Sequence, residues 1–348
     1  MLDSRVYTRR MMLGVAMGGS LLLREGQLLP SATTRSSSPP LAPRLDARSL
    51  TPLSAFGLPS RNGDVRYPSW LEGTWRARNT IDGFSMPLGS AFVDTFTRAI
   101  AEDDVAIQEP LHYSLRYVLA PSGNDEIESV AQDRRFNAVE ETNAFLGPDG
   151  GTVRQCVYEC CGPMAPHGRL VIEVADAADK DVGSGGGGGG TRIELLIMWV
   201  QWGAASSGAF VTSELVRQRV TRSPDAYEAS AQDETTFLEI LTRFEPERFA
   251  GGRPASQASA PQRVRVRNRI ANYLSLDGLG DSGLRLDGLG DSGLRLDGLG
   301  DSGLAPQLAR ETEREARMTL AAGRAVSFFD YDWMLVRAGD GLGTGQMV

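Results

Sequence analysis

Two groups of polar side chains have the residue types and the spacing that are found in acid–base catalysis. Asp330 and Asp332 stand two positions apart, so they share one face of an extended strand. Paired carboxylates of this kind serve as acid and base in some active sites. Glu214, Arg217 and Gln218 form the second group. Carboxylates at strand edges are more often simply hydrated, so we assign no catalytic residue and treat an enzyme as the less favoured class.

A repeated segment imitates a protease motif. Residues 276–304 contain Leu-Asp-Gly-Leu-Gly-Asp-Ser-Gly three times, and the tetrad at Gly290–Gly293 also occurs in the nucleophile loop of chymotrypsin-like proteases. A nucleophilic serine needs a base and a third residue that orients the base. The chain has two histidines, His112 and His167, and neither lies in a sequence resembling the histidine motif of that family. We interpret the repeats as a flexible loop, with calcium binding by the Asp and Gly residues as the alternative.

The remaining candidate motifs do not predict a cofactor or a metal. Gly183–Gly190 resembles a phosphate-binding loop, but it lacks the lysine that reaches the phosphates. The spacing of Cys156, Cys160 and Cys161 matches none of the usual zinc patterns. We therefore expect neither kind of site.

Composition narrows the class of protein. The chain has 348 residues, 41% hydrophobic residues and a formal net charge of -8, which is ordinary for a soluble globular protein. Sequence-independent nucleic-acid binding needs a basic surface, so the acidic charge argues against that class. No nucleic-acid partner is expected.

The first 60 residues have the composition of a targeting segment and a disordered linker. Arg9 and Arg10 precede the apolar run Met11–Leu23, which is shorter than the roughly 20 residues that span a bilayer. This arrangement is typical of a signal peptide for twin-arginine export, so we expect no integral membrane span in the mature protein. Residues 31–52 are rich in Ser, Pro and Arg and are expected to be disordered.

Residues 61–340 then form one domain with flexible insertions at 183–190, 251–262 and 276–304. Between the insertions, apolar residues mostly recur at every second position, which predicts half-buried antiparallel strands. The clearest strands are Leu111–Leu119, Arg192–Trp202, Phe210–Thr221, Val264–Leu274 and Ala325–Arg337. Helices are expected at Ala91–Ala101, at Arg134–Leu146 after an Asp133 cap, and at Pro306–Ala322.

The ends of this domain resemble those of calycin-type β-barrels, which open on Gly-x-Trp and finish on an aromatic strand with an Arg. Gly73 and Trp75 match the opening, and Arg337 matches the finish. Strand parity lets Trp75 and Arg337 both face inward, and a guanidinium over an indole would stabilise the closure by ~1–2 kcal/mol. The resemblance implies a mainly β fold: a single antiparallel calycin- or lipocalin-like barrel with a few short flanking helices.

Phrases along most of residues 67–337 also resemble an uncharacterised family shared by cyanobacteria and the plastids of plants and algae. The phrases are Tyr67-Pro68-x-Trp70-Leu71-x-Gly73-x-Trp75, Met86-Pro87-Leu88-Gly89, Asp133-Arg134-Arg135-Phe136-Asn137, Phe210-Val211-Thr212-Ser213-Glu214-Leu215-Val216-Arg217-Gln218 and Ala325-Val326-Ser327-Phe328-Phe329-Asp330-Tyr331. The resemblance implies a thylakoid-associated plastid protein of unknown biochemical function. The twin-arginine segment would then direct the protein to the thylakoid lumen.

The favoured function is non-enzymatic binding of an apolar ligand, such as a pigment, quinone or lipid, inside the barrel. This expectation depends on the strand around Trp199 and Trp202, which is apolar on both faces, and on the aromatic last strand with Tyr331. Glu214 and Gln218 complete the candidate ligand-binding set. One alternative is a barrel filled by its own side chains. Another is an assembly or auxiliary factor that binds a photosynthetic membrane complex.

Overall fold

A computed structural model describes residues 41–52, 60–61, 63–119, 130–147, 151–160, 167–175, 190–205, 208–222, 232–247, 261–274 and 323–339. The strands are β1 (Gly73–Ser85), β2 (Leu111–Leu119), β3 (Val130–Gln132), β4 (Thr152–Glu159), β5 (Arg169–Ala175), β6 (Gly190–Ala204), β7 (Phe210–Arg222), β8 (Gln232–Pro246), β9 (Arg263–Tyr273) and β10 (Ser327–Arg337). The helices are α2 (Thr95–Ile107) and α3 (Arg134–Leu146), with short 3-10 turns η2 (Ala42–Asp46), η4 (Ser69–Leu71) and η5 (Ser90–Phe92).

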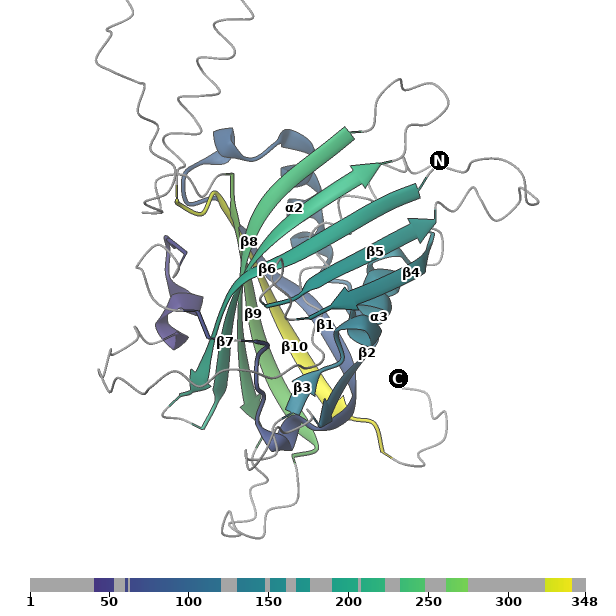
Figure 1. Ribbon diagram of the computed structural model, residues 1–348. Helices are drawn as coiled ribbons and strands as arrows, with labels where there is room; N and C mark the ends of the chain where they lie inside the picture. The colour runs from purple at the N-terminus through teal and green to yellow at the C-terminus, as the bar shows by residue number, and fades with distance from the viewer. Residues whose placement is uncertain are drawn as a thin grey trace, which may run out of the picture.

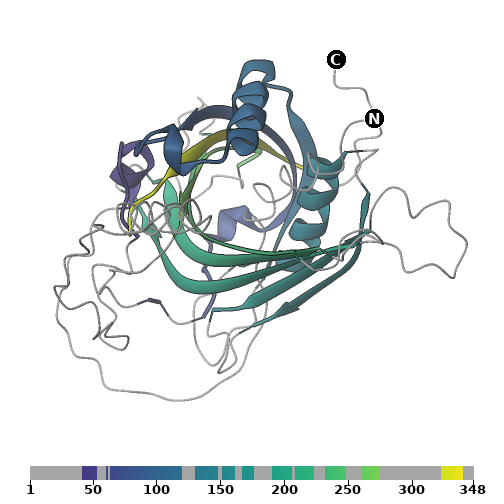
Figure 2. The same ribbon diagram turned by 90° about the horizontal axis from the view of Figure 1, so that it is seen from above.

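All ten strands belong to one antiparallel sheet, in the order β3-β2-β1-β10-β9-β8-β7-β6-β5-β4. The sheet curls around an apolar interior into a half-barrel (Figures 1 and 2). The mainly β, barrel-like fold expected from the sequence is therefore confirmed. The expected helix 306–322 and the repeats at 276–304 lie outside the described residues, as do 183–189 and 251–260 of the other two insertions.

Helix α3 lies between the two ends of the sheet and contacts β2, β4 and β5. Two of its asparagines bind backbone N–H groups of strands on opposite sides. Asn137 Oδ1 accepts from the Arg116 amide at 2.7 Å, and Asn143 Oδ1 accepts from the Val153 amide at 3.1 Å. The helix thus bridges the two ends of the sheet through its side chains.

The first and last strands pair as predicted, with Trp75 opposite Arg337. The Arg337 guanidinium lies 4.5 Å from the centroid of the Trp75 ring and donates to the backbone oxygens of Glu72 and Trp70. Gly73 has a φ of +113°, and a Cβ at this position would stand 2.9 Å from an Arg337 nitrogen. The motif therefore needs glycine both for its backbone conformation and for the close approach of the guanidinium.

Both described helices begin where an aspartate caps the first turn. The predicted boundaries of α3 are confirmed, and the Asp133 side chain accepts from the Phe136 amide at 3.1 Å. Helix α2 starts later than the expected Ala91, because Asp94 caps it by accepting from the Thr97 amide at 2.9 Å. The chain before Asp94 forms the short turn η5 instead.

Residues 41–52 are packed, so the expectation of a disordered linker is wrong for this segment. Leu45 and Leu50 are buried against the outer face of the sheet in one cluster with Leu241. The Arg44 guanidinium also contacts both carboxylate oxygens of Glu239 at 2.7 Å. The composition suggested disorder because residues 31–52 are rich in Ser, Pro and Arg, but Leu45 and Leu50 cover an apolar part of the outer surface.

Candidate functional site

A cavity of about 100 Å³ opens at one end of the half-barrel, where the end of α2 meets the inner face of β1 and β10. Its walls come from both helices, from three neighbouring strands and from the residues between α2 and β2. The lining residues are Asn79, Ile81, Asp104, Ile107, Glu109, Leu111, Phe145, Phe329 and Tyr331. Apolar side chains make most of this wall, and a few polar groups interrupt it.

Asn79 is the most enclosed polar group of the wall, with 1% of its surface exposed. Its Nδ2 donates to the Tyr113 hydroxyl at 3.2 Å, while its Oδ1 has no hydrogen-bond partner among the described residues. A buried acceptor without a partner costs about 1–3 kcal/mol, and this oxygen is almost completely covered by its neighbours. Tyr331 lies opposite Ile81 in the same wall, and burial raises the pKa of its hydroxyl, with a further contribution from Asp104.

Glu141 lies one helical turn before Phe145 on α3, further into the interior. The side chain is 0% exposed, and neither carboxylate oxygen has a hydrogen-bond partner within the described part of the chain. Burial raises the pKa of this carboxyl well above its ordinary value. Its charge in turn contributes to the raised pKa values of Tyr113 and Tyr117, after burial, which places all three groups close together. Burial therefore favours the neutral form of this acid.

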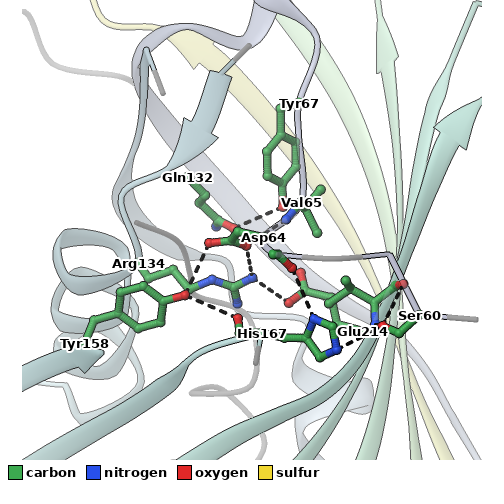
Figure 3. Close-up of polar contacts among 11 residues, drawn as sticks. Ser60, Asp64, Val65, Tyr67, Gln132, Arg134, Tyr158, His167 and Glu214 are labelled. Atoms are coloured by element: carbon green, nitrogen blue, oxygen red, sulfur yellow. Dashed lines mark hydrogen bonds and ion pairs between the residues drawn. The ribbon is translucent and has the colours of Figure 1, made fainter. Parts of the chain in front are cut away.

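The densest polar network of the described residues surrounds Arg134, the first residue of α3 (Figure 3). Its guanidinium lies between two buried carboxylates, 2.7 Å from Asp64 and 2.8 Å from Glu214. Burial raises the pKa of Glu214, and the charge of Arg134 opposes that rise. The Tyr158 hydroxyl donates to the second oxygen of Asp64 at 3.2 Å. These contacts tie α3 to β4, to β7 and to the chain before β1.

A serine and a histidine extend this network. Ser60 Oγ lies 3.1 Å from Nε2 of His167, and Nδ1 of the ring lies 3.2 Å from the Gly63 carbonyl. A carbonyl only accepts, and burial lowers the pKa of His167, so the neutral ring donates from Nδ1 and accepts the serine proton at Nε2. Ser60 Oγ also accepts from the Val200 amide at 2.9 Å. A backbone carbonyl orients the ring, and the serine oxygen already accepts a hydrogen bond from a backbone amide. We therefore interpret the pair as a structural contact that holds Ser60 against His167.

The structure does not bring the predicted ligand-binding residues together. Tyr331 lines the cavity, whereas Glu214 belongs to the Arg134 network. Gln218 is buried, and its Nε2 has no partner among the described residues. Trp202 packs against the interior and lies under Arg61, whose guanidinium carbon is 4.7 Å from the ring centroid. Three of these four therefore stand away from the cavity.

Trp199 faces outward, contrary to the expectation that it lines the interior. The pairing of β6 with β7 shifts between Ile197 and Trp199, and this bulge reverses the alternation of faces. Ile197 and Val200 consequently face the interior, while Trp199 packs with Leu215 and Leu41. The apolar outer face of this strand is thus explained by a cover from the N-terminal segment.

Sequence reasoning missed most of the residues that line the cavity. Asn79 could have been identified, because it shares a strand face with Trp75 and an amide that faces the interior needs hydrogen-bond partners. Glu141 carried a weaker signal as an acid one helical turn from an aromatic residue. Asp104 and Glu109 looked like ordinary surface acids, because nothing in the sequence shows that the end of α2 reaches the sheet.

A family model described as a domain of unknown function (DUF6816) matches residues 59–158. The match spans β1 to β4 with both helices, so it includes every residue of the cavity wall except Phe329 and Tyr331. The chain is similar to this family over that stretch. No curated protein and no solved structure matches the chain.

The described residues hold no group of three His, Cys, Asp or Glu side chains placed to bind a metal ion. Among their helices, none has both the length and the apolar character needed to cross a membrane.

Proposed function

We propose that the protein binds a small molecule with an apolar body in the cavity at the end of the half-barrel. The observation that carries this proposal is the cavity itself, whose wall is mainly apolar and holds a few polar side chains. Ligand sites typically combine apolar walls, which provide affinity, with a few polar groups that fix orientation. Ile81, Leu111 and Phe329 provide the first feature, and Glu109 and Tyr331 provide the second.

The positions of the paired carboxylates favour binding over catalysis. Asp330 and Asp332 alternate with the inward-facing Phe329 and Tyr331, so they point to the outer face of β10. Arg269 contacts Asp330 at 2.6 Å, and Arg265 contacts Asp332 at 2.9 Å. Both acids are therefore engaged in ion pairs on the side of the sheet opposite the cavity.

The volume of the cavity bears on the kind of ligand. Sites for drug-sized molecules occupy roughly 300–1,000 Å³. A cavity of about 100 Å³ therefore fits one ring or a short chain. A pigment, quinone or lipid would insert only one end into the cavity, and the rest of the molecule would lie outside it.

A titration with benzyl alcohol, a neutral one-ring probe, tests the proposal. Amide chemical shifts should change around Asn79 and Tyr331. Leu111→Trp places a larger side chain in the cavity wall and should abolish these changes. Leu119→Trp is the matched control, because Leu119 ends the same strand and is 49% exposed, and it should leave them intact. Equal shift changes in both variants, or none in the wild type, would refute the proposal.

We also propose that the protein acts in the plastid, in the thylakoid lumen. Support comes from the paired Arg9 and Arg10 before an apolar run, together with the resemblance to the plastid and cyanobacterial family. A reporter fused behind residues 1–60 should reach the lumen. Replacing both arginines with lysine should leave the reporter outside the thylakoid, and unchanged transfer would contradict a twin-arginine signal.

A further inference from the structure

Four exposed arginines stand together on the outer face of the sheet, two on β1 and two on β9. The residue between the two arginines of each strand is buried, so all four side chains point away from the interior. This arginine cluster consists of Arg76, Arg78, Arg263 and Arg265. In the strand register, Val336 of β10 lies between Arg76 and Arg263. Met334 lies between Arg78 and Arg265 in the next row, so each row holds one apolar side chain between two guanidinium groups.

Most of the charge of this cluster is not neutralised. Several other arginines of the outer face form ion pairs, namely Arg169 with Glu194, Arg192 with Glu173, Arg267 with Asp46 and Arg269 with Asp330. Within the cluster, Arg265 has a partner, since Asp332 lies 2.9 Å from its guanidinium. In the part of the chain that the structure describes, the other three side chains form no hydrogen bond or ion pair. The cluster therefore attracts anions locally, although the whole chain is acidic.

The spacing of the cluster matches that of an extended polypeptide. The two arginines of each strand are two residues apart, which is about 7 Å. Alternate side chains of an extended chain project from one face at this same spacing. Two carboxylates at positions i and i+2 can therefore lie over Val336 and Met334 at once. Each then stands between arginines on strands about 10 Å apart, within reach of both guanidinium groups, which bind carboxylates in a bidentate geometry.

The surroundings favour a short acidic segment over a continuous polyanion. The cluster is only two rows long, and acids follow it at one end, with Asp332 on β10 and Asp82 on β1. The outer face of the half-barrel is also convex (Figure 2). A flat anionic membrane would touch such a face along a narrow strip, and the net charge of -8 on the chain would oppose the approach.

We propose that the arginine cluster is a docking site for an acidic segment of a partner protein, which lies extended along β10 with carboxylates at alternate positions. One carboxylate lies between Arg76 and Arg263, and the other lies between Arg78 and Arg265. The site is on the face of the sheet opposite the ligand cavity, so it goes beyond the proposed function and does not depend on it.

Three capped pentapeptides test this inference with the full chain. Thr-Glu-Thr-Glu-Thr has the required spacing, Thr-Glu-Glu-Thr-Thr has the same charge with adjacent carboxylates, and Thr-Gln-Thr-Gln-Thr has no charge. Titration with the first peptide at low salt should shift amide signals of β1, β9 and β10 around the cluster. The second should bind about fivefold more weakly, because adjacent side chains of an extended chain point to opposite faces. The uncharged peptide should cause no shifts, and added salt should weaken binding of the first.

The double variant Arg76→Gln/Arg263→Gln removes both guanidinium groups of one row and should weaken binding of the first peptide about fivefold. Arg192→Gln/Arg217→Gln is the matched control, because it makes the same charge change at exposed positions of β6 and β7 on the same face, and it should leave binding intact. Vesicles containing phosphatidylglycerol and a short oligothymidylate represent the other polyanions. Three outcomes would overturn the inference: equal binding of the two glutamate peptides, equal losses in the two double variants, or a loss in Arg76→Gln/Arg263→Gln of vesicle or oligonucleotide binding but not of peptide binding.

Discussion

Replacing Glu141 with glutamine removes an ionisable group from the interior while keeping nearly the same shape. The carboxyl is fully buried and lacks a hydrogen-bond partner among the described residues. Burial raises its pKa well above the ordinary value of 4.5. Below that value the group is protonated in the folded and the unfolded protein alike. Between that value and the raised pKa of the folded state, the unfolded chain is ionised while the folded protein keeps its proton.

The sign and size of the effect follow from this difference in bound protons. The raised folded-state pKa makes the contribution of Glu141 most favourable at low pH, and this contribution is lost as pH rises through the folded pKa. Between the two pKa values, the free energy of unfolding falls by about 1.4 kcal/mol for each pH unit because of this one group. Glutamine does not titrate, so Glu141→Gln should be more stable than the wild type by a margin that grows with pH and then levels off.

Urea unfolding of the wild type and Glu141→Gln, from about pH 4 to about pH 8, measures this margin. The two proteins should differ by less than about 1 kcal/mol at the acidic end, where both side chains are neutral. Glu102→Gln, at an exposed position, should follow the wild-type curve. A constant difference between wild type and Glu141→Gln across the range would refute the reasoning. It would mean that Glu141 ionises normally, and therefore that water or a charged group reaches it.

Three further substitutions test the framework of the site. Arg337→Ala removes the contact with the indole and the hydrogen bonds to backbone oxygens, and should cost about 2 kcal/mol in urea unfolding. Arg265→Ala, which breaks only an exposed pair, should cost less than about 1 kcal/mol, and equal losses would contradict the closure. Arg134→Ala leaves two buried carboxylates unpaired and should cost about 3–5 kcal/mol. Adding Asp64→Asn should recover part of that loss, and full additivity of the two changes would argue against the network. Arg44→Ala should speed hydrogen exchange in residues 41–52, and unchanged exchange would show that the leucines alone hold the segment.

Local patterns predicted the parts of the fold that depend on local physics. The alternation in Leu111–Leu119 and the capping aspartate before Arg134 predicted two elements with correct boundaries. Parity also placed Trp75 and Arg337 on facing positions of strands far apart in the sequence. These inferences succeeded because each depends on residues a few positions apart, or on a motif that joins two distant strands.

The errors arose where long-range packing decides the outcome. A one-residue bulge before Trp199 moved that ring to the outer face, and no residue type in β6 marks the bulge. Residues 41–52 are ordered by the outer surface of strands far along the chain. Asn79 shares the strand parity of Trp75, but its partner, the Tyr113 hydroxyl, comes from another strand and could not be read from β1 alone. Single residues of the site could therefore be predicted from the sequence, but not the way in which they lie together in the fold.

The wall of the half-barrel does not resist expansion equally all the way round. Neighbouring strands are joined by rows of backbone hydrogen bonds, whereas α3 joins β2 to β4 through side chains such as Asn137 and Asn143. Displacing the later turns of the helix, beyond the buried ion pairs that hold Arg134, breaks a few such contacts, while parting any two long strands breaks a whole ladder. Since α3 also carries Phe145 and Glu141, an occupant too large for the space at rest would make room by moving this helix and would carry both side chains with it.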